Sequence, residues 1–421
     1  MLKHLLHRVI RHGRLTVTTP SGEISAGQLD AGHHSGLLDV RVRIRTPRAV
    51  LKIATNPDLY LGEAYMDGDL VVERGSLYEF MELIASNIAA LGHDPSPRIA
   101  RWAGRLAGVV SQRNDPATSR ANVAHHYDLS DGLYRVFLDE DLQYSCAYFR
   151  DPDDDIATAQ SAKKQHIIAK LLLRPGQHVL DIGCGWGGLA LSIARAAHVR
   201  VTGVTLSKEQ LATARQRART EGLEDRVDFQ LIDYRRLQGQ FDRIVSVGMF
   251  EHVGRPNYET YFGAIRRLLT PSGVALVHSI GKMHGPSPTS LWILKYIFPG
   301  GYIPALSEVL PAIERNALWI TDLEVLRLHY AGTLRLWRER FMSRWPELSR
   351  TYDERFRRMW EFYLVGSEIS FRYSGFMVFQ VQLSRAIDAL PTTREYIHEA
   401  EDFLRQQALT LADAAVAEKC L

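Results

Sequence analysis

The pattern of apolar and polar residues first indicates a small α+β module near the start of the chain. Between Leu15 and Val72 apolar and polar residues alternate in three runs, which are Leu15–Thr19, Val40–Arg45 and Val50–Ala54. Period-two alternation interrupted by glycines and prolines predicts half-buried antiparallel strands. A helix from Leu77 to Ile88 follows and completes the predicted module.

Two basic segments flank this module. Met1–Arg14 and Arg98–Val110 contain no acidic residue, and their basic side chains are interleaved with apolar ones at helical spacing. Amphipathic helices of this kind suit an anionic bilayer surface. For the first segment, the alternative is a terminal helix that packs on its own domain. We therefore expect residues 1–120 to form a domain that associates with lipid or membrane, or that mediates dimerisation.

From residue 121 onwards, the period alternates between that of strands and that of helices. The predicted strands are Val179–Ile182, Val199–Val204, Val227–Leu231, Arg243–Val247, Val274–His278 and Phe376–Leu383. The predicted helices are Ile156–Leu172, Leu189–Ala197, Lys208–Glu221, Tyr258–Leu268, Tyr352–Phe371 and a last one after Thr392. Such alternation predicts an α/β fold, a doubly wound and mostly parallel sheet over residues 121–421. Lys282–Pro311 is a long aromatic connection, and long connections are usually functional.

Composition narrows the class of protein. The 421 residues are 46% hydrophobic and 24% charged, which suits two or three packed globular units. Basic and acidic residues nearly balance at a net charge of +3, so charge does not argue for nucleic acid. Three cysteines without a CxxC pair indicate a reducing compartment. The chain has no apolar run of ~20 residues and no signal peptide, so we expect a cytoplasmic protein associated with the inner face of the membrane. We expect no metal site.

A glycine-rich segment, Val179–Gly188, joins a predicted strand to a predicted helix. A strand, a tight turn and a helix N-terminus place a ligand against free backbone N–H groups. Gly183, Gly185 and Gly188 also fit the dinucleotide fingerprint, but Thr205–Ser207 stands where a nicotinamide enzyme is expected to carry an acid. The pattern resembles motif I of the S-adenosylmethionine-dependent methyltransferases. The alternative is a glycine-rich turn in another doubly wound domain.

Further segments narrow the resemblance to one family. They are Tyr144–Phe149, Met249–Gly254, Val277–Gly281, Tyr296–Gly301 and His329–Ala331. In this order and spacing they resemble the cyclopropane-fatty-acyl-phospholipid synthase family, to which mycolic acid cyclopropane synthases are related. The resemblance covers about residues 121–384, and the first module resembles, more weakly, the extra domain of phospholipid-acting members. Gly366 and Ser367 stand where many members carry a cysteine, a departure that bears on packing of the acyl tunnel.

The resemblance implies transfer of a methylene group from S-adenosylmethionine to the cis double bond of an unsaturated phospholipid acyl chain. The alkene attacks the sulfonium methyl, and a base then removes a proton from the transferred methyl so that the ring closes. This reaction needs a water-poor acyl tunnel and a base that survives there. In the family the base is bicarbonate. The matching positions are Cys146, Glu251, His278, Ile280 and Tyr330, with Cys146 and Ile280 contributing backbone groups.

The resemblance also implies a cofactor site. Its positions are Tyr144, with Asp181, Gly183 and Gly185 at the methionine moiety and Thr205 and Gln210 at the ribose. Tyr234 is a candidate stacking partner for adenine, and the alternative is a surface tyrosine. For Glu251 and His252, the alternative is that they are ordinary polar residues that cap the end of a strand. A carboxylate beside bicarbonate repels it unless one of them carries a proton, which would raise a carboxyl pKa.

The acyl tunnel is expected between the aromatic segment 291–304 and the helix that carries Met359 and Tyr363, although aromatic stripes are also typical of a simple core. Three other functions stay open. A relative could methylate the same alkene without ring closure and give a methyl-branched chain. A small-molecule N- or O-methyltransferase would not require the set Cys146, Glu251, His278 and Tyr330. A lipid-binding or dimerising platform with an inactive enzyme is opposed by the intact motifs, and a homodimer is one expected assembly.

Overall fold

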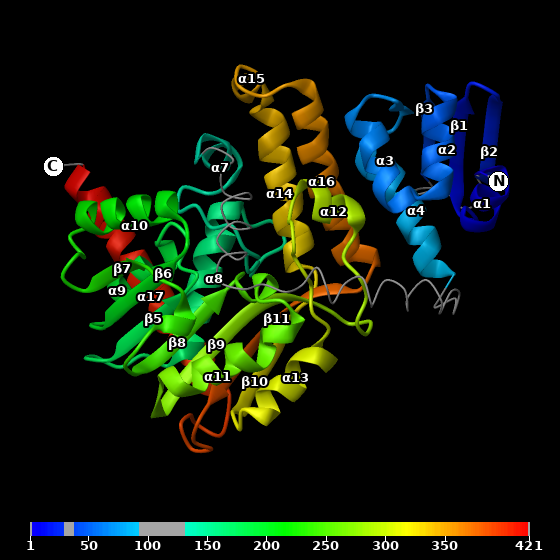
Figure 1. Ribbon diagram of the computed structural model, residues 1–421. Coiled ribbons are helices and arrows are strands. Elements are labelled where there is room, and N and C mark those ends of the chain that lie inside the picture. Colours follow the sequence, from blue (N-terminus) through cyan, green and yellow to red (C-terminus); the bar gives the residue numbers. More distant parts are fainter. Residues whose placement is uncertain (1, 29–37, 92–130, 420–421) are drawn as a thin grey trace. The chain divides into compact units, whose positions relative to one another are not determined.

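The computed structural model describes residues 2–28, 38–91 and 131–419, which form two compact units. Unit 1 combines residues 1–111, 287–301 and 330–376, and unit 2 combines residues 112–286, 302–329 and 377–421. Each unit is therefore assembled from segments that are far apart in the sequence (Figure 1). The predicted domain boundary after residue 120 and the predicted helix 98–110 lie outside the described residues. The two predicted domains, 1–120 and 121–421, stay a prediction.

Unit 1 contains a four-stranded sheet in the order β2-β1-β3-β4. The strands are β1 (Gly13–Thr19), β2 (Gly22–Gln28), β3 (Asp39–Ile44) and β4 (Leu70–Arg74). The outer pairs are antiparallel, but β1 and β3 pair in parallel, so the prediction of antiparallel strands is wrong for the central pair. β2 turns back from β1 on one side, and β3 then starts from the same end as β1 on its other side.

The segment Val50–Ala54, predicted as a strand, lies in helix α2 (Pro47–Thr55). Pro47 occupies the first turn, and the Thr46 hydroxyl accepts a hydrogen bond from the Ala49 N–H at 3.2 Å. Both features start helices, and the buried residues Ala49 and Ile53 lie one helical turn apart. The prediction was wrong because these start signals outweigh a short local alternation.

The other helices of unit 1 come from both halves of the sequence. They are α1 (Leu2–Val9), α3 (Pro57–Met66), α4 (Leu77–Ala90), α12 (Leu291–Tyr296), α14 (His329–Ser343), α15 (Trp345–Leu348) and α16 (Glu354–Tyr373). The helix predicted over Met1–Arg14 ends at Val9, because Gly13 with φ +81° begins β1. The predicted helices 77–88 and 352–371 are confirmed as α4 and α16, whereas α14 was not predicted.

Unit 2 is built on a seven-stranded sheet in the order β10-β11-β9-β8-β5-β6-β7. The strands are β5 (His178–Ile182), β6 (Arg200–Thr205), β7 (Val227–Leu231), β8 (Phe241–Val247), β9 (Leu269–Lys282), β10 (Trp319–Leu326) and β11 (Phe376–Ser384). From β9 to β7 all pairs are parallel, and β10 pairs antiparallel with β11. The predicted mostly parallel sheet is confirmed, while β10 was not predicted.

Helices cover both faces of this sheet. The helices of unit 2 are α7 (Asp131–Phe137), α8 (Ile156–Leu171), α9 (Gly188–Ala196), α10 (Lys208–Thr220), α11 (Tyr258–Leu268), α13 (Leu306–Arg315) and α17 (Glu395–Lys419), with short 3₁₀ turns η1 (Tyr234–Arg236), η2 (Phe250–His252) and η3 (Arg255–Asn257). Along β5, Leu180 and Ile182 join one buried cluster and Val179 joins another. Successive strand residues point to opposite faces, so both faces are buried, as a doubly wound sheet requires.

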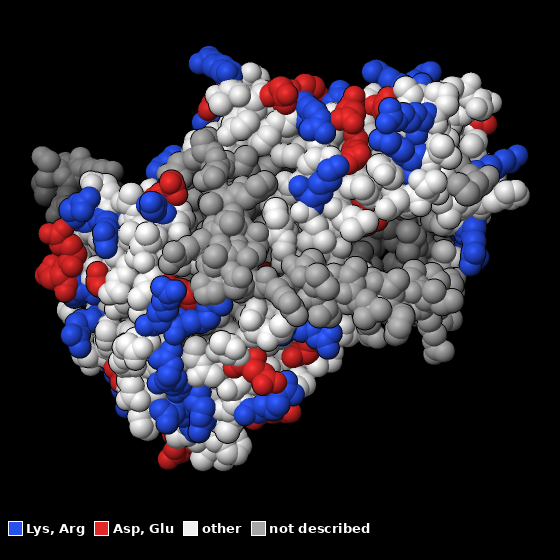
Figure 2. Space-filling view, in the orientation of Figure 1, with Lys and Arg blue, Asp and Glu red and all other residues white. Residues whose placement is uncertain are grey.

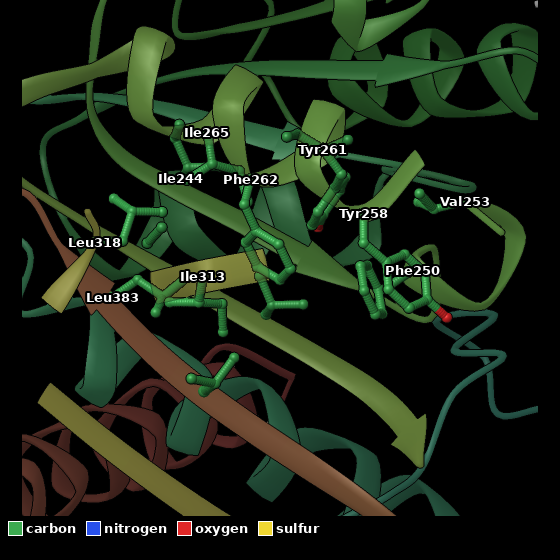
Figure 3. Packing of buried hydrophobic residues seen from close by; sticks show 14 of the residues in the cluster. Ile244, Phe250, Val253, Tyr258, Tyr261, Phe262, Ile265, Ile313, Leu318 and Leu383 are labelled. Carbon is green, nitrogen blue, oxygen red and sulfur yellow. The ribbon is translucent and has the colours of Figure 1, made fainter. Parts of the chain in front are cut away.

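The first of these clusters is rich in aromatic residues (Figure 3). Phe250 of η2 lies against Tyr258 and Tyr261 of α11, with ring centroids 4.5 and 5.0 Å apart. This packing fixes the turn after β8, which carries Glu251. Within the described parts of the chain, no helix is long and apolar enough to cross a membrane.

Candidate cofactor and anion site

The glycine loop leads from β5 into α9, as predicted. Gly183, Gly185 and Gly187 have φ values of +82°, +54° and +86°, which favour glycine. A Cβ atom on Gly187 would lie 2.7 Å from the Phe229 ring, so packing also demands glycine there. A Cβ atom on Gly185 would meet no atom within 4 Å. The loop therefore leaves open space at Gly185, where a ligand can approach the backbone.

Asp181 lies near the carboxyl end of β5, immediately before this loop. Its side chain is 2% exposed, and Oδ2 has no hydrogen-bond partner among the residues that the structure describes. Burial raises the pKa of Asp181 to about 7, and the nearby Lys163 ammonium partly opposes this rise. An unsatisfied buried acceptor is costly. A bound ammonium or other N–H donor would therefore be stabilised at Oδ2.

Two polar residues of α8 hold the segment that contains Tyr144 and Cys146. The Lys163 ammonium donates to Gln143 Oε1 and to Ser145 Oγ, the latter at 3.0 Å. Gln160 Nε2 donates to the backbone oxygens of Gln143 and Ser145 at 3.2 and 2.9 Å. Both residues are fully buried, and burial lowers the pKa of Lys163 to about 8.

Neither Gln160 nor Lys163 was predicted as part of the site. The signal available in the sequence was a glutamine and a lysine three positions apart on one face of a helix. The segment that they hold lies beside the end of β8, because a Cβ atom on Gly248 would lie 3.8 Å from Ser145 Cβ. Tyr144 itself packs edge-on against Tyr134, with centroids 5.3 Å apart.

The residues predicted for the ribose side meet at the end of β6. Thr205 Oγ1 donates to Gln210 Oε1 at 2.9 Å, and both side chains are buried. Ser207 caps α10 by accepting a hydrogen bond from the Gln210 N–H at 3.2 Å. This turn therefore carries neutral hydrogen-bonding groups at the position where a nicotinamide enzyme is expected to carry an acid.

Tyr234 follows β7 in η1. Its ring is half-buried, packs edge-on against Tyr261 at 5.6 Å, and has the Arg235 guanidinium 5.7 Å from its centroid. Burial raises the pKa of the Tyr234 phenol. Because the Tyr234 ring packs on the buried Tyr261, Tyr234 is not simply a surface tyrosine. Its stacking on adenine stays a prediction.

Glu251 lies in η2, and its carboxyl group connects the end of β8 to β9. Oε1 accepts a hydrogen bond from the Ile280 N–H at 2.7 Å, whereas Oε2 is buried without a partner in the described residues. Burial raises the pKa of Glu251 to about 7 despite the bond from Ile280. The Ile280 N–H, which the resemblance assigns to bicarbonate, is thus directed at Glu251. The turn also borders the glycine loop, since a Cβ atom on Gly183 would lie 2.9 Å from Met249 Cγ.

His278 lies on β9 two residues before Ile280 and is buried. Gln380 Nε2 of the neighbouring strand β11 lies 3.1 Å from His278 Nδ1. Burial holds the pKa of His278 well below its usual range, so the imidazole is neutral. His252 lies beside Glu251 in η2, and burial lowers the pKa of His252 too.

The structure brings together part of the predicted anion site. In unit 2, Glu251 of η2 contacts the Ile280 N–H of β9, and His278 lies two residues before Ile280 on the same strand. The segment of Cys146 lies beside Gly248. Tyr330 is the second residue of α14 in unit 1, where its ring packs on Trp337 and Phe371 at 5.8 and 4.9 Å. Its membership of the anion site stays a prediction. No group of three metal-ligating side chains occurs within the described ranges.

The two segments predicted as acyl-tunnel walls contact each other within unit 1. Trp292 of α12 packs on Phe362 of α16 with ring centroids 4.8 Å apart, and Phe298 packs on Tyr363 at 5.8 Å. A Cβ atom on Gly62 would lie 2.6 Å from Trp292 Cδ1, so α3 provides close backbone approach to this pair. Passage of an acyl chain between these aromatic residues stays a prediction.

Solved structures define the class of this protein. The cyclopropane synthase MmaA2 from Mycobacterium tuberculosis superposes with a TM-score of 0.60 at 34% identity, covering 63% of this chain and 97% of that one. Mycolic acid cyclopropane synthase CmaA1 complexed with SAH and CTAB gives the same values. Coclaurine N-methyltransferase bound to N-methylheliamine and SAH superposes with a TM-score of 0.63 at 22% identity, covering 77% of this chain and 98% of that one. At this identity the similarity concerns the fold only. The sheet is that of S-adenosylmethionine-dependent methyltransferases.

Sequence comparisons define the family. The sequence model of the mycolic acid cyclopropane synthetase family matches residues 114–381. Cyclopropane-fatty-acyl-phospholipid synthase of Escherichia coli K12 is 39% identical over 354 residues, 84% of this chain and 90% of that protein. Tuberculostearic acid methyltransferase UfaA1 of Mycobacterium tuberculosis is 39% identical over 341 residues, 77% and 78% of the two chains. This chain belongs to the cyclopropane synthase family, as the motifs predicted, and is an S-adenosylmethionine-dependent methyltransferase.

Proposed function

We propose that this enzyme forms cyclopropane rings at the cis double bonds of unsaturated phospholipid acyl chains. S-adenosylmethionine would provide the added carbon, and bicarbonate would be the base. The observation that carries the proposal is the turn beside the glycine loop, where Glu251 accepts a hydrogen bond from the Ile280 N–H, two residues after His278 on β9, and keeps its buried Oε2 without a partner among the described residues. The Escherichia coli relative named as a cyclopropane-fatty-acyl-phospholipid synthase supports this choice of substrate.

The residues present fit S-adenosylmethionine. Asp181 Oδ2 is a buried acceptor that the ammonium group of the methionine moiety would satisfy. Gly185 leaves room for close approach, and the Thr205–Gln210 pair offers neutral partners to ribose hydroxyls. When bound, S-adenosylmethionine supplies an activated methyl group. The part of this chain is to hold the cofactor in a buried loop and to exclude water.

The residues at the turn also fit bicarbonate, an anion that both donates and accepts hydrogen bonds. With a pKa of about 7, Glu251 is protonated in a large fraction of molecules at neutral pH. Because Oε1 accepts from the Ile280 N–H, Oε2 is the atom that would carry this proton. A protonated carboxyl group donates to an anion instead of repelling it. Bicarbonate would supply the base, with the Cys146 backbone and the Tyr330 hydroxyl completing its site.

Mass spectrometry of membrane lipids tests the proposed reaction. The enzyme is expressed in a host without its own cyclopropane synthase, and acyl chains are compared with those of a host that carries the Gly185→Ala variant. We expect unsaturated chains to gain one methylene and to lose the double bond. Unchanged acyl chains in the presence of active cofactor turnover would contradict the lipid substrate and favour a small-molecule methyltransferase.

Methylation of the same alkene without ring closure is the second candidate. The relative named tuberculostearic acid methyltransferase has the same 39% identity as the synthase over its aligned residues. Both reactions would share the cofactor and the alkene and would differ in the fate of the methyl proton. Without a reductant the two products have the same mass, because each gains the transferred carbon and loses one proton. Proton NMR of the extracted lipids separates them, since a cyclopropane shows high-field ring protons and a branched chain keeps a double bond.

We further propose that unit 1 contacts an anionic membrane peripherally. Lys3, Leu5 and Arg8 of α1 are exposed, but Ile10 after the helix is buried. The backbone N–H groups of Arg11 and His12 both donate to the Asn87 side chain at 2.8 Å, so this segment also packs on its own unit. Attraction between basic side chains and anionic lipids would therefore contribute more to membrane binding than insertion of apolar side chains. Basic and acidic side chains are interspersed over the described surface seen in Figure 2. A homodimer also stays a prediction.

A further inference from the structure

We propose that Gln380 is a positioning residue that keeps His278 a neutral donor through Nε2–H, so that His278 holds the anion and is not the base. This inference rests on the proposed function. Gln380 lies on β11 and His278 on the neighbouring strand β9, and both side chains are buried. Gln380 Nε2 lies 3.1 Å from His278 Nδ1.

The direction of this hydrogen bond determines the tautomer. An amide nitrogen of glutamine only donates, so the Nδ1 that faces it must offer its lone pair. A neutral imidazole that accepts at Nδ1 carries its proton on Nε2. The ring then presents an N–H group on its other side. In this state His278 can bind an anion, but it has no free lone pair to remove a proton from a methyl group.

The charges around His278 act in the same direction. On α8 the neighbouring groups are Lys163, Lys170 and His166, and β10 contributes Glu324. The three cationic or ionisable groups of α8 disfavour a further positive charge on the imidazole, and Glu324 only partly offsets them. A carboxylate in place of the neutral Gln380 amide would favour protonation of His278. The residue type at position 380 therefore sets which nitrogen of His278 holds the proton.

A purely structural role would leave a feature of Gln380 unexplained. Its Oε1 is buried and has no partner among the described residues, although an apolar side chain of similar size would avoid that cost. Gln382, two residues further along β11, is equally buried and has its amide nitrogen bonded to the Lys170 backbone oxygen at 2.6 Å and to the Tyr396 hydroxyl at 2.7 Å. Gln382 is thus a matched control on the same strand.

Nitrogen NMR of the free enzyme with labelled histidine reads the tautomer directly, because bare and protonated ring nitrogens have distinct shifts. The His278→Gln variant assigns the signals. We expect a bare Nδ1 and a protonated Nε2 in the wild type and in Gln382→Leu, from mildly acidic to mildly basic pH. In Gln380→Glu we expect a protonated Nδ1. Gln380→Met, which keeps the length without a donor, should give a mixture and serves if Gln380→Glu fails to fold.

Bicarbonate dependence of the rate provides the second readout. Above neutral pH, Gln380→Glu turns Nε2 into an acceptor and removes one donor from the anion, so we expect a loss of ~10²-fold in rate at limiting bicarbonate. On the acid side the imidazolium regains Nε2–H, so the defect should shrink relative to the wild type. The affinity for S-adenosylmethionine should not change in any of these variants.

The outcomes separate this inference from the proposed function. A protonated Nδ1 in the wild type, or an unchanged tautomer in Gln380→Glu and Gln380→Met, overturns the role of Gln380 while bicarbonate dependence can persist. The expected tautomers together with rates that never depend on bicarbonate overturn the proposed base and the anion-holding role of His278. The expected tautomers and a bicarbonate defect confined to the Gln380 variants support both.

Discussion

The Glu251 carboxyl group accepts a hydrogen bond from the Ile280 backbone N–H at 2.7 Å, which joins the turn after β8 to strand β9. This contact has a direct chemical consequence. Oε1 accepts this bond, whereas the buried Oε2 has no hydrogen-bond partner among the described residues and is the oxygen better placed to hold a proton or to meet a ligand. One backbone hydrogen bond therefore orients the carboxyl group on which the proposed anion site depends.

Replacing Glu251 with Gln should change how stability depends on pH. The pKa of Glu251 is raised from its usual 4.5 to about 7, so its contribution is fully present below about pH 4.5 and is lost as pH rises through about 7. As the pH rises between these limits, the free energy of unfolding of the wild type should fall relative to that of the variant by at most about 3 kcal/mol. Denaturant unfolding across pH measures this difference. Asp181 shifts the same way in both proteins and cancels, so a constant difference would contradict the assignment.

Replacing Tyr330 with Phe should slow the reaction without loosening the cofactor. The ring, which packs on Trp337 and Phe371, is retained, and only the hydroxyl is lost. One oxyanion-type donor is worth about 2.7–4 kcal/mol in the barrier, so we expect a ~10²–10³-fold lower rate. Added bicarbonate should partly restore the rate. Full activity of the unmodified enzyme in bicarbonate-free buffer would exclude this role.

Replacing Gly185 with Ala should weaken S-adenosylmethionine binding at least ~10-fold, because the new methyl group enters the open space of the loop. Gly176→Ala is the control, since Gly176 also has a positive φ, +82°, and open space, in the turn before β5. Calorimetry should show normal affinity for the control. Gly183→Val, also expected to abolish binding, is a less clean test because its Cβ would lie 2.9 Å from Met249 Cγ.

Replacing Lys163 with Met should weaken cofactor binding through Asp181 and the 143–146 segment. Lys163 holds Ser145 and lowers the pKa of Asp181 relative to burial alone, so its removal should raise that pKa above about 7. Asp181 then stays protonated at neutral pH and loses its attraction for an ammonium group. Lys170→Met, at an equally buried lysine of α8 that pairs with Glu324, should destabilise the fold but leave cofactor affinity unchanged.

Binding to anionic vesicles should fall when Lys3 and Arg8 are replaced with Gln. Each engaged basic residue contributes ~1 kcal/mol near an anionic surface. The attraction should weaken with added salt, which screens charge within about 10 Å at 0.1 M. Sedimentation with anionic and neutral vesicles measures both effects. Equal binding of the wild type to the two vesicle types would leave no role for charge, in Met1–Arg14 or in Arg98–Val110.

Local pattern determined much of the catalytic half. Strand Val227–Leu231 and helix Tyr258–Leu268 have the predicted bounds, because their period and their flanking turns are local properties of the chain. The positive φ angles of the loop follow from its glycines in the same way. The family was also decided by sequence, since several independent motifs agree in order and spacing.

Tertiary structure decided what the period of the chain cannot encode. The pairing of β1 with β3 in parallel and the place of β10 beside β11 depend on which strands meet, and not on alternation within a strand. The hydrogen-bond partners at the site also come from different elements. Gln380 and His278 are 102 positions apart in the sequence, and Lys163 donates to Ser145 from helix α8. Such contacts arise when the sheet buries polar side chains that must then find partners. Sequence alone predicted the candidate site residues, and packing decided which residues contact them.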